Sequence, residues 1–361
     1  MTAIEQAKVV ALTAPLYVAW EITRLCNAQC VHCYSDSGPT VNRAGELSTD
    51  EALRVIDELA DASVMVLAFS GGEPILRKDW LSLVRHAIGE GLSVNIGSNG
   101  STISEEVACQ LAEVGVRSVT VSLDSDVAES HDRFRRLPGL FAKATNAITR
   151  LARHGLRVVV GFTPTKLNWR DGPGVVRLAF ELGASAANLS EYVPAGRGTL
   201  DLSLSPDDLH KVLCEWIQLR EEYRGRVDVI WHDCRVGMLV PDSERRQYVG
   251  CGAGRFVARI CANGDVTPCV FLPTVIGSLK RNTFSEIWGR SELLQKFRER
   301  QGHVHGNCGE CAHLATCGGC RAVAHAYSAG DVFAGDPHCW IERAPSDRLV
   351  RMLVEGESVP A

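Results

Sequence analysis

Three cysteines lie close together near the N-terminus, in the stretch CNAQCVHC at residues 26–33. Cys26, Cys30 and Cys33 are separated by three residues and then by two. Three thiolates on one short loop can hold three irons of a four-iron cluster and leave the fourth iron free to bind a substrate or a cofactor. A tetrahedral zinc site would need a fourth ligand, for which His32 is the local alternative. The spacing therefore favours an open iron–sulfur site.

A second group of cysteines fills the C-terminal third of the chain, where nine of the fourteen cysteines lie. Seven of them form the pattern Cys-x12-Gly-x4-Cys, then Cys-x2-Cys-x5-Cys-x2-Cys, then one isolated Cys. These seven are Cys251, Cys269, Cys308, Cys311, Cys317, Cys320 and Cys339. Two Cys-x2-Cys pairs alone are typical of a zinc ribbon. Seven thiolates exceed one zinc site, however, and suit two four-iron clusters. Cys109 and Cys214 lie on apolar helix faces and are expected to be ordinary core residues.

Composition places the chain among water-soluble globular proteins, and the lack of a targeting segment predicts its cellular compartment. The 361 residues are 45% hydrophobic and 22% charged, with a formal net charge of −5. The one short basic stretch, at residues 133–136, is too small to predict nucleic-acid binding. The sequence shows neither a signal peptide nor the roughly 18–20 consecutive apolar residues of a membrane helix. We therefore expect a cytoplasmic protein whose thiols stay reduced, which makes metal ligation a better explanation than disulfides.

Short apolar runs alternate with amphipathic stretches over the first half of the chain. The expected strands are residues 17–23, 64–70, 92–98, 118–124, 157–163 and 186–193, and the expected helices are residues 49–62, 78–91, 104–116, 140–155 and 205–223. Ser48 or Thr49, and Ser104, stand where helix N-caps are expected. This alternation predicts an α/β fold with a parallel sheet. Polar or glycine-rich residues directly follow the first four strands, at the sheet edge where such folds place their chemistry.

The cysteine loop, joined by the sequence SGGEP at residues 70–74, resembles the signature of the radical SAM superfamily. The resemblance implies a partial (β/α)6 barrel in which a [4Fe–4S] cluster binds S-adenosylmethionine (SAM) and cleaves it reductively to a 5′-deoxyadenosyl radical. It also implies SAM contacts from Gly71, Gly72, Glu73, Pro74, Ser98, Asn99, Ser122, Asp124 and Arg135. A solvated basic turn is the alternative for Arg135. His32 stands where the family often has an aromatic residue, so the adenine contact is left open.

The C-terminal pattern resembles the SPASM extension, which adds two auxiliary four-iron clusters to such a barrel. By position, the outer cluster would be held by Cys308, Cys311, Cys317 and Cys339, and the inner one by Cys251, Cys269 and Cys320. The chain departs from the commonest form, which has three residues rather than two between the last pair. The fourth inner ligand is Cys261, Cys234, a non-cysteine group or none. The implied cofactors are thus three [4Fe–4S] clusters and SAM. We expect a barrel at 15–225, a SPASM domain at 230–345 and a flexible tail at 346–361.

The substrate is predicted less sharply. The segments EYVPAGRG (191–198) and CGGCRAVAHAYSAGDVFAGDPHC (317–339) resemble members that act on tetrapyrrole side chains in the haem and haem d1 pathways. Related members include a sugar-acid decarboxylase of peptidyl-nucleoside antibiotic pathways. Radical decarboxylation of a small carboxylate-bearing molecule is therefore expected, supported by an external one-electron reductant of the flavodoxin or ferredoxin type. Arg197 and Arg321 are candidate partners of the substrate carboxylate.

Two other enzymatic outcomes and one non-enzymatic function stay open. The enzyme could oxidise or cross-link a ribosomal peptide, or act as a small-molecule dehydrogenase or epimerase. The barrel begins near residue 17, so a maturase would need a separate peptide-recognition protein. A simple electron carrier would need neither the open iron nor the SGGEP turn. No residue identifies itself as the catalytic acid or base.

Overall fold

One ten-stranded sheet organises the chain in a computed structural model that describes residues 12–245 and 247–341. Its strand order is β10-β9-β8-β1-β2-β3-β4-β5-β6-β7. Strands β1 to β7 are parallel to one another and β8 pairs parallel with β1, while β9 pairs antiparallel with both β8 and β10. The strands are β1 (Tyr17–Thr23), β2 (Val66–Gly71), β3 (Ser93–Ser98), β4 (Ser118–Ser122), β5 (Val158–Phe162), β6 (Ala186–Ser190), β7 (Asp228–His232), β8 (Val257–Ile260), β9 (Asp265–Thr267) and β10 (Gly277–Ser278).

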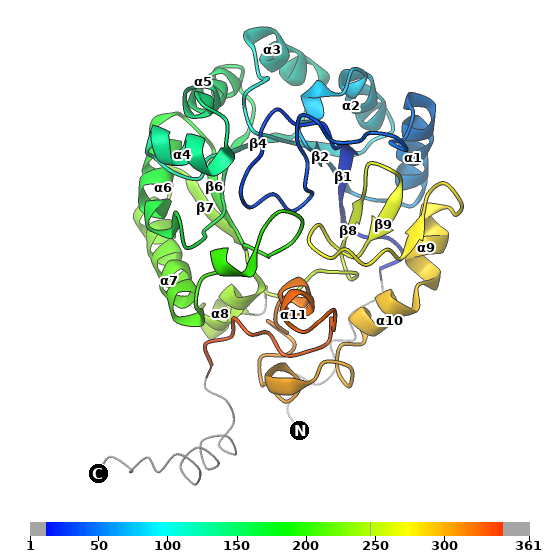
Figure 1. Cartoon of the computed structure of the whole chain (residues 1–361), viewed down its shortest axis with the longest axis vertical. Coiled ribbons are helices and arrows are strands. Elements are labelled where there is room, and N and C mark those ends of the chain that lie inside the picture. Colours follow the sequence, from blue (N-terminus) through cyan, green and yellow to red (C-terminus); the bar gives the residue numbers. More distant parts are fainter. Residues whose placement is uncertain (1–11, 246, 342–361) are drawn as a thin grey trace.

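Helices surround the curved sheet on its outer face (Figure 1). They are α1 (Thr49–Asp61), α2 (Trp80–Gly89), α3 (Glu105–Val114), α4 (Ala128–Arg135), α5 (Leu140–Arg153), α6 (Gly172–Glu181), α7 (Pro206–Glu222), α8 (Asp242–Arg245), α9 (Phe284–Arg290), α10 (Glu292–Arg298) and α11 (Arg321–Tyr327). The predicted α/β architecture is confirmed. Ser48 caps α1 in a capping box with Glu51, and Ser104 caps α3. None of the helices among the described residues is long and apolar enough to span a membrane.

The sequence did not predict strands β7 to β10 or helix α6. Strand β7 extends the parallel series by one, and helix α6 opens with Gly172-Pro173-Gly174, which is typical of a turn. Proline is tolerated at the first turn of a helix because its missing N–H would have no partner there. Strands β7 and β8, which lie beyond residue 225, extend the parallel sheet at its two ends, β7 beside β6 and β8 beside β1. The domain division at 225–230 stays a prediction, and the predicted tail at 346–361 lies outside the described residues.

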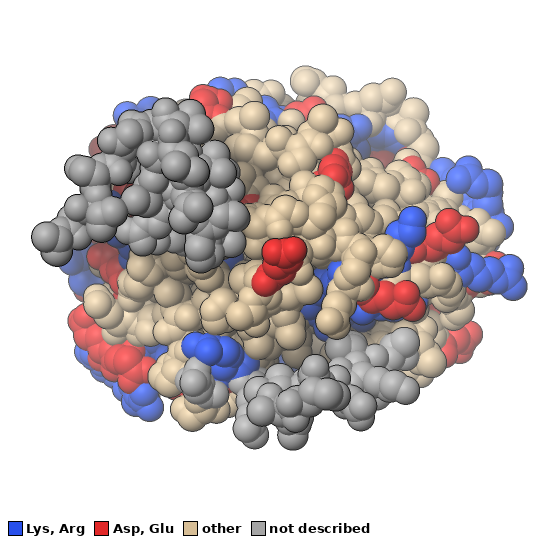
Figure 2. Space-filling view, turned by 90° about the horizontal axis from the view of Figure 1, so that it is seen from below, with Lys and Arg blue, Asp and Glu red and all other residues tan. Residues whose placement is uncertain are grey.

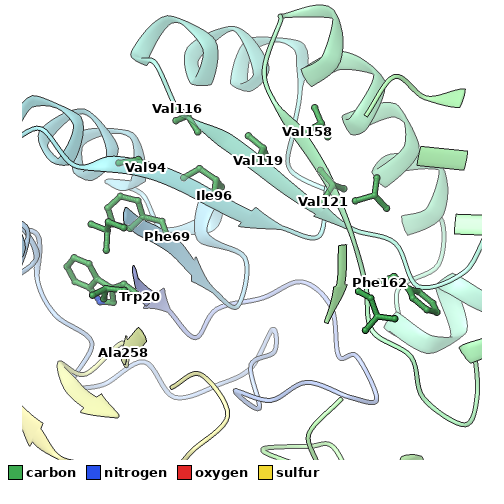
Figure 3. Close-up of a cluster of buried hydrophobic side chains, with 14 of the residues drawn as sticks. Trp20, Phe69, Val94, Ile96, Val116, Val119, Val121, Val158, Phe162 and Ala258 are labelled. Carbon is green, nitrogen blue, oxygen red and sulfur yellow. The ribbon is translucent and has the colours of Figure 1, made fainter. Parts of the chain in front are cut away.

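The two faces of the sheet carry side chains of different size. Trp20 and Phe69 point toward the helices with ring centroids 5.9 Å apart, and buried valines such as Val121 continue this layer (Figure 3). The alternate residues on the inner face include Ala19, Ala68 and Gly97. Because successive strand residues point to opposite faces, large outward residues form the core and small inward ones leave a hollow.

On the face shown in Figure 2, the described acidic and basic side chains are interspersed rather than gathered into one basic patch. This mixture matches the modest net charge of −5.

Candidate active site

The hollow inside the sheet is a cavity of about 620 Å³, a volume typical of a small-molecule site. The loop that follows β1 crosses its opening (Figure 1, dark blue). Most of the residues expected to bind the cluster and SAM line this cavity: Cys26, Cys30, Cys33, Gly71, Gly72, Ser98, Asn99, Ser122 and Arg135. They come from the C-terminal ends of four neighbouring strands, as the alternation of strands and helices predicts. Glu73, Pro74 and Asp124 do not line the cavity.

The three loop thiols are free, and Cys26 and Cys30 receive contacts from N–H groups. The Ala28 backbone N–H lies 3.4 Å from Cys26 Sγ, and Asn99 Nδ2 lies 3.8 Å from the same sulfur. Arg135 Nη1 lies 3.7 Å from Cys30 Sγ. Burial raises the pKa of Cys26 to about 12, so this thiol would become a thiolate only on binding a metal. Buried thiols surrounded by N–H donors fit an iron–sulfur cluster.

Arg197 fastens the cysteine loop from the far side of the barrel. Its Nε donates to Cys30 O at 2.9 Å, its Nη2 donates to Ser37 O at 2.9 Å, and its Nη1 pairs with Asp36 at 2.8 Å. The backbone of the neighbouring Gly196, at φ +59°, lies so close to the cysteine loop that a Cβ on it would be 2.4 Å from Tyr34 O. Arg197 thus fastens the loop and also lines the cavity, and its contact with a substrate carboxylate stays a prediction.

Replacing Arg197 by alanine should loosen the cysteine loop without unfolding the barrel. Each lost hydrogen bond removes about 1 kcal/mol. We expect the iron content of the loop site to become substoichiometric, and SAM cleavage to fall with it. Arg197→Lys should restore little of the iron content, because one ammonium group cannot reproduce three differently directed N–H groups. Anaerobic iron analysis measures the effect, and full iron occupancy in Arg197→Ala would contradict it.

The SGGEP turn has a role in positioning that the sequence did not predict. A Cβ on Gly71 would lie 2.3 Å from Thr23 O, and one on Gly72 would lie 2.2 Å from Leu25 O, so both glycines allow β2 to approach the β1 loop. The Glu73 carboxylate is completely buried. It accepts hydrogen bonds from Ser98 Oγ at 2.8 Å and from the Asn99 backbone N–H at 2.8 Å. Glu73 therefore holds the end of β3 in place, and its contact with SAM stays a prediction.

Asp124 likewise acts through a neighbour. It is fully buried at the end of β4, and its Oδ2 accepts from Arg135 Nε at 2.6 Å. This pair aims the guanidinium at Cys30, so Arg135 is not a solvated turn residue. Asp124 is a positioning residue rather than a wall residue.

The opposite wall of the cavity comes from β6 and β7. Asn188 Nδ2 donates to Ser190 Oγ at 3.0 Å and lies 3.4 Å from His232 Nδ1. Burial lowers the pKa of His232, so its imidazole is neutral at pH 7. Because the side chains expected to contact SAM lie on β1 to β4, this wall is free to face a substrate.

Four C-terminal cysteines surround a second, very small cavity of about 10 Å³. They are Cys308, Cys311, Cys317 and Cys339, the set expected for the outer cluster. Backbone N–H groups already point at three of the sulfurs: Asp336 N at 3.3 Å from Cys308, His313 N at 3.4 Å from Cys311 and Gly319 N at 3.3 Å from Cys317. This arrangement fits a closed site.

The remaining C-terminal thiols gather between this cavity and the barrel. Burial raises the pKa of Cys269 to about 12, and Cys251 next to it raises the pKa further. Burial raises the pKa of Cys320 most, and nearby Glu191 and Cys251 raise it further. The thiols of Cys251, Cys269 and Cys320 therefore lie near one another. Cys234 hydrogen-bonds to Cys317 of the outer set, and its charged form interacts with Glu191, which also faces Cys320.

Cys261 lies apart from this group, beside the ion pair of Arg259 and Glu21, whose Nη2 and Oε2 are 2.6 Å apart. Of the two candidate fourth ligands, Cys234 thus lies between the outer set and the inner group, and Cys261 lies outside both. Cys109 and Cys214 are half-buried on the surfaces of α3 and α7, which corrects their assignment to the core.

A buried charge network joins the barrel to the C-terminal region. Arg235 is fully buried and contacts Glu191, Asp233 and Asp336, the last at 2.8 Å. Burial raises the pKa of Glu191 to about 8. Sequence reasoning missed this network because its members are far apart in the chain, Arg235 and Asp336 by 101 residues. Arg321 is also buried and donates to the carbonyls of Val332 and Ala334, so it is not available to a substrate.

Comparison with known proteins agrees with this geometry. The profile of the radical SAM superfamily matches residues 20–176, and the SPASM iron–sulfur cluster-binding domain matches residues 251–312. The chain is 33% identical to the AdoMet-dependent heme synthase of Methanosarcina barkeri, over 90% of this chain and 96% of the relative. It is 34% identical to the mycofactocin maturase MftC of Mycobacterium tuberculosis, over 97% of this chain and 85% of the relative. SuiB of Streptococcus suis, bound to S-adenosylmethionine, superposes with a TM-score of 0.76 at 17% identity, over 91% of this chain and 78% of that chain.

The fold and the two cysteine-bearing cavities thus define a radical SAM enzyme with a SPASM extension. This chain belongs to the radical SAM superfamily, and its cofactors are [4Fe–4S] clusters and SAM.

Proposed function

We propose that this enzyme acts in the biosynthesis of a cofactor or natural product and removes a carboxylate as CO2 from a carboxylate-bearing substrate. The observation that carries the proposal is the cavity with two different walls, one bearing Cys26, Cys30 and Cys33 and the other bearing Asn188 and His232. The bound cluster and SAM would supply a 5′-deoxyadenosyl radical, after reduction by a flavodoxin-type or ferredoxin-type protein. The near full-length similarity to a heme synthase supports the pathway class.

The cluster ligands are assigned from the grouping of the thiols. Cys26, Cys30 and Cys33 hold the SAM-binding cluster, and the four cysteines of the small cavity hold the outer auxiliary cluster. Cys251, Cys269, Cys320 and Cys234 hold the inner one. Side chains of Ser98, Asn99, Ser122 and Arg135, with the backbone of Gly71 and Gly72, form the SAM pocket.

The proposed reaction begins with the loss of a hydrogen atom from the carbon next to the carboxylate-bearing carbon. The bond to the carboxylate then breaks, CO2 leaves, and the two carbons form a double bond. One electron is left over at this point. The C-terminal cysteines would hold an auxiliary cluster able to accept this electron, and the 5′-deoxyadenosyl radical from SAM would take the first electron with the hydrogen atom, so the substrate would be oxidised by two electrons overall.

The substrate class is inferred from the relatives. Besides the heme synthase, the chain is 28% identical to the pre-heme d1 synthase of Dinoroseobacter shibae, over 91% of this chain and 86% of the relative. These names point to a tetrapyrrole with carboxylate side chains. A sugar-acid nucleoside is the other small carboxylate-bearing candidate.

Replacing His232 by phenylalanine should separate substrate handling from SAM cleavage. The imidazole faces the cavity from β7, away from the cysteine loop, so its loss should spare the cluster. We expect CO2 release to fall at least about tenfold, the cost of roughly 1.4 kcal/mol. Abortive formation of 5′-deoxyadenosine should continue. Asn188→Leu should have the same effect. Loss of 5′-deoxyadenosine together with CO2 in either variant would contradict a role in handling the substrate.

The proposal is tested by incubating the reduced, anaerobically reconstituted enzyme with SAM and Fe-coproporphyrin III, a tetrapyrrole with propionate side chains. We expect 5′-deoxyadenosine and CO2 in equal amounts, and a substrate mass lower by the elements of formic acid for each side chain that reacts. Formation of 5′-deoxyadenosine without CO2 from this tetrapyrrole or from sugar-acid nucleosides would overturn decarboxylation of a small molecule.

Peptide modification is the second candidate, favoured by the similarity to the mycofactocin maturase over 97% of this chain. A separate peptide-recognition protein would then present the precursor. CO2 release or cross-linking that requires both a precursor peptide and such a protein would favour this function over the first.

A further inference from the structure

Three buried arginines in the C-terminal region have guanidinium nitrogens with no hydrogen-bond partner. These atoms are Arg255 Nε, Arg300 Nη1 and Arg321 Nη2, and the three residues are 7%, 6% and 0% exposed. A buried cation that lacks a partner costs several kcal/mol. Such atoms therefore indicate that an anion lies beside them when the protein carries its cofactors.

Arg300 points into the inner cysteine group. Its Nη1 lies between Gly250 and Gly318, where added Cβ atoms would sit 3.2 Å and 2.6 Å from it. These glycines are the chain neighbours of Cys251 and Cys317. The charged groups that face Arg300 are the thiols of Cys251, Cys234 and Cys317, and the guanidinium of Arg321.

Arg255 approaches the same group from the other side. Its Nη1 donates to Val249 O at 2.5 Å and to Cys251 O at 3.4 Å, and Arg300 Nη2 donates to the same Val249 carbonyl at 3.0 Å. The two guanidinium groups are close enough to repel each other. Within residues 12–245 and 247–341, neither Arg255 nor Arg300 forms an ion pair with a carboxylate. Their counterion is therefore the thiolate-bound cluster itself.

We propose that Arg255 and Arg300 donate hydrogen bonds to the inner auxiliary cluster, compensate its negative charge and raise its reduction potential, an inference that rests on the inner ligand set assigned above. Net charge and hydrogen bonds to the sulfurs are among the factors that set the potential of an iron–sulfur cluster. A nearby uncompensated cation stabilises the reduced, more negative form.

The other two sites differ in this respect. Arg135, beside Cys30, is neutralised by Asp124 at 2.6 Å. Arg235, beside the outer site, is neutralised by Glu191, Asp233 and Asp336. Arg321, which interacts with Cys308 of the outer site, also lacks a carboxylate partner among the described residues, so the outer site has one such arginine and the inner site has two. The inner cluster is thereby fitted to accept the electron left over from the substrate, while the SAM-binding cluster keeps a lower potential suited to reducing SAM.

The test is an anaerobic redox titration of Arg300→Gln and Arg255→Gln, followed by electron paramagnetic resonance. Both are made in the full chain with Cys26, Cys30 and Cys33 replaced by alanine, so that only the auxiliary clusters contribute. We expect one cluster to become at least tenfold harder to reduce in each variant, a fall of about 59 mV for a one-electron couple. Arg300→Lys, which keeps the charge, should retain most of the potential.

Arg298→Gln is the matched control, because Arg298 is a neighbouring arginine that donates to Gly254 O and Trp288 O, not to the cysteine group. Unchanged potentials in both glutamine variants at full iron content would overturn the proposal, as would an equal fall in Arg298→Gln. If the glutamine variants lose the inner cluster, retention of its iron in Arg300→Lys supports charge compensation, and its loss there overturns it. The readout is independent of substrate: lowered potentials in these variants, together with no CO2 release by the wild-type enzyme, would uphold this inference and reject the decarboxylation.

Discussion

Replacing Cys26, Cys30 and Cys33 together by alanine is expected to remove about four irons per chain and to abolish formation of 5′-deoxyadenosine. The three thiols share one cavity wall with the glycine turn and the ends of β3 and β4, and no other cysteine lines that cavity. The barrel should remain folded, because its core is made by residues such as Trp20 and Phe69 on the opposite face of the sheet. Anaerobic iron and sulfide analysis, with chromatography of the SAM products, measures both effects.

Cys109→Ala provides the matched control for this variant. Cys109 lies on the outer surface of α3, where its Sγ is 3.3 Å from Glu113 Oε1, and it should leave iron content and SAM cleavage unchanged. About twelve irons in the wild type and about eight in the triple variant would agree with one loop cluster and two auxiliary ones. Twelve irons in both proteins would exclude the loop as a cluster site.

Local signals in the sequence were enough to predict the frame of the barrel. Strand β1 has the predicted bounds, and Ser48 and Ser104 cap their helices because each supplies an oxygen to a free backbone N–H. The cysteine spacing works in the same way, since the three loop thiols are neighbours on one short segment. In all these cases the interacting groups are at most a few residues apart, so composition and periodicity contain the information.

The supports of the site could not be predicted in this way. Arg197 contacts the carbonyl of a residue 167 positions earlier, and Arg235 contacts Asp336 101 positions later. Both partners are brought together only when β6 and the C-terminal region close against the barrel. An arginine without a nearby carboxylate in the sequence resembles a surface or substrate-binding residue. For that reason Arg197 and Arg321 were expected to bind substrate, whereas both hold backbone carbonyls.

The fourth ligand of the inner cluster is expected to be Cys234 rather than Cys261. The Cys234 thiol hydrogen-bonds to Cys317, and its charged form interacts with Glu191 beside the inner group. A carboxylate oxygen of Glu191, one of Asp233 and the Cys234 sulfur all lie within 4.8 Å of one another. Cys234 therefore stands among groups that bind metals. Cys234→Ala should therefore remove or degrade the inner cluster, with a loss of up to about four irons. Anaerobic iron analysis and the signal of the reduced auxiliary clusters measure it.

Cys261→Ala is the companion variant, and it should keep all of the iron. In the wild type, Cys261 lies in the turn between β8 and β9, where its N–H donates to Asp265 O and its side chain faces Arg259. If Cys261→Ala loses iron and Cys234→Ala does not, the assignment is reversed, and the β8–β9 turn would have to move toward Cys251 when the cluster forms. If both variants keep a complete cluster, a non-cysteine ligand completes the site, and Glu191 and Asp233 are then the residues to replace next, because their carboxylates already lie beside Cys234.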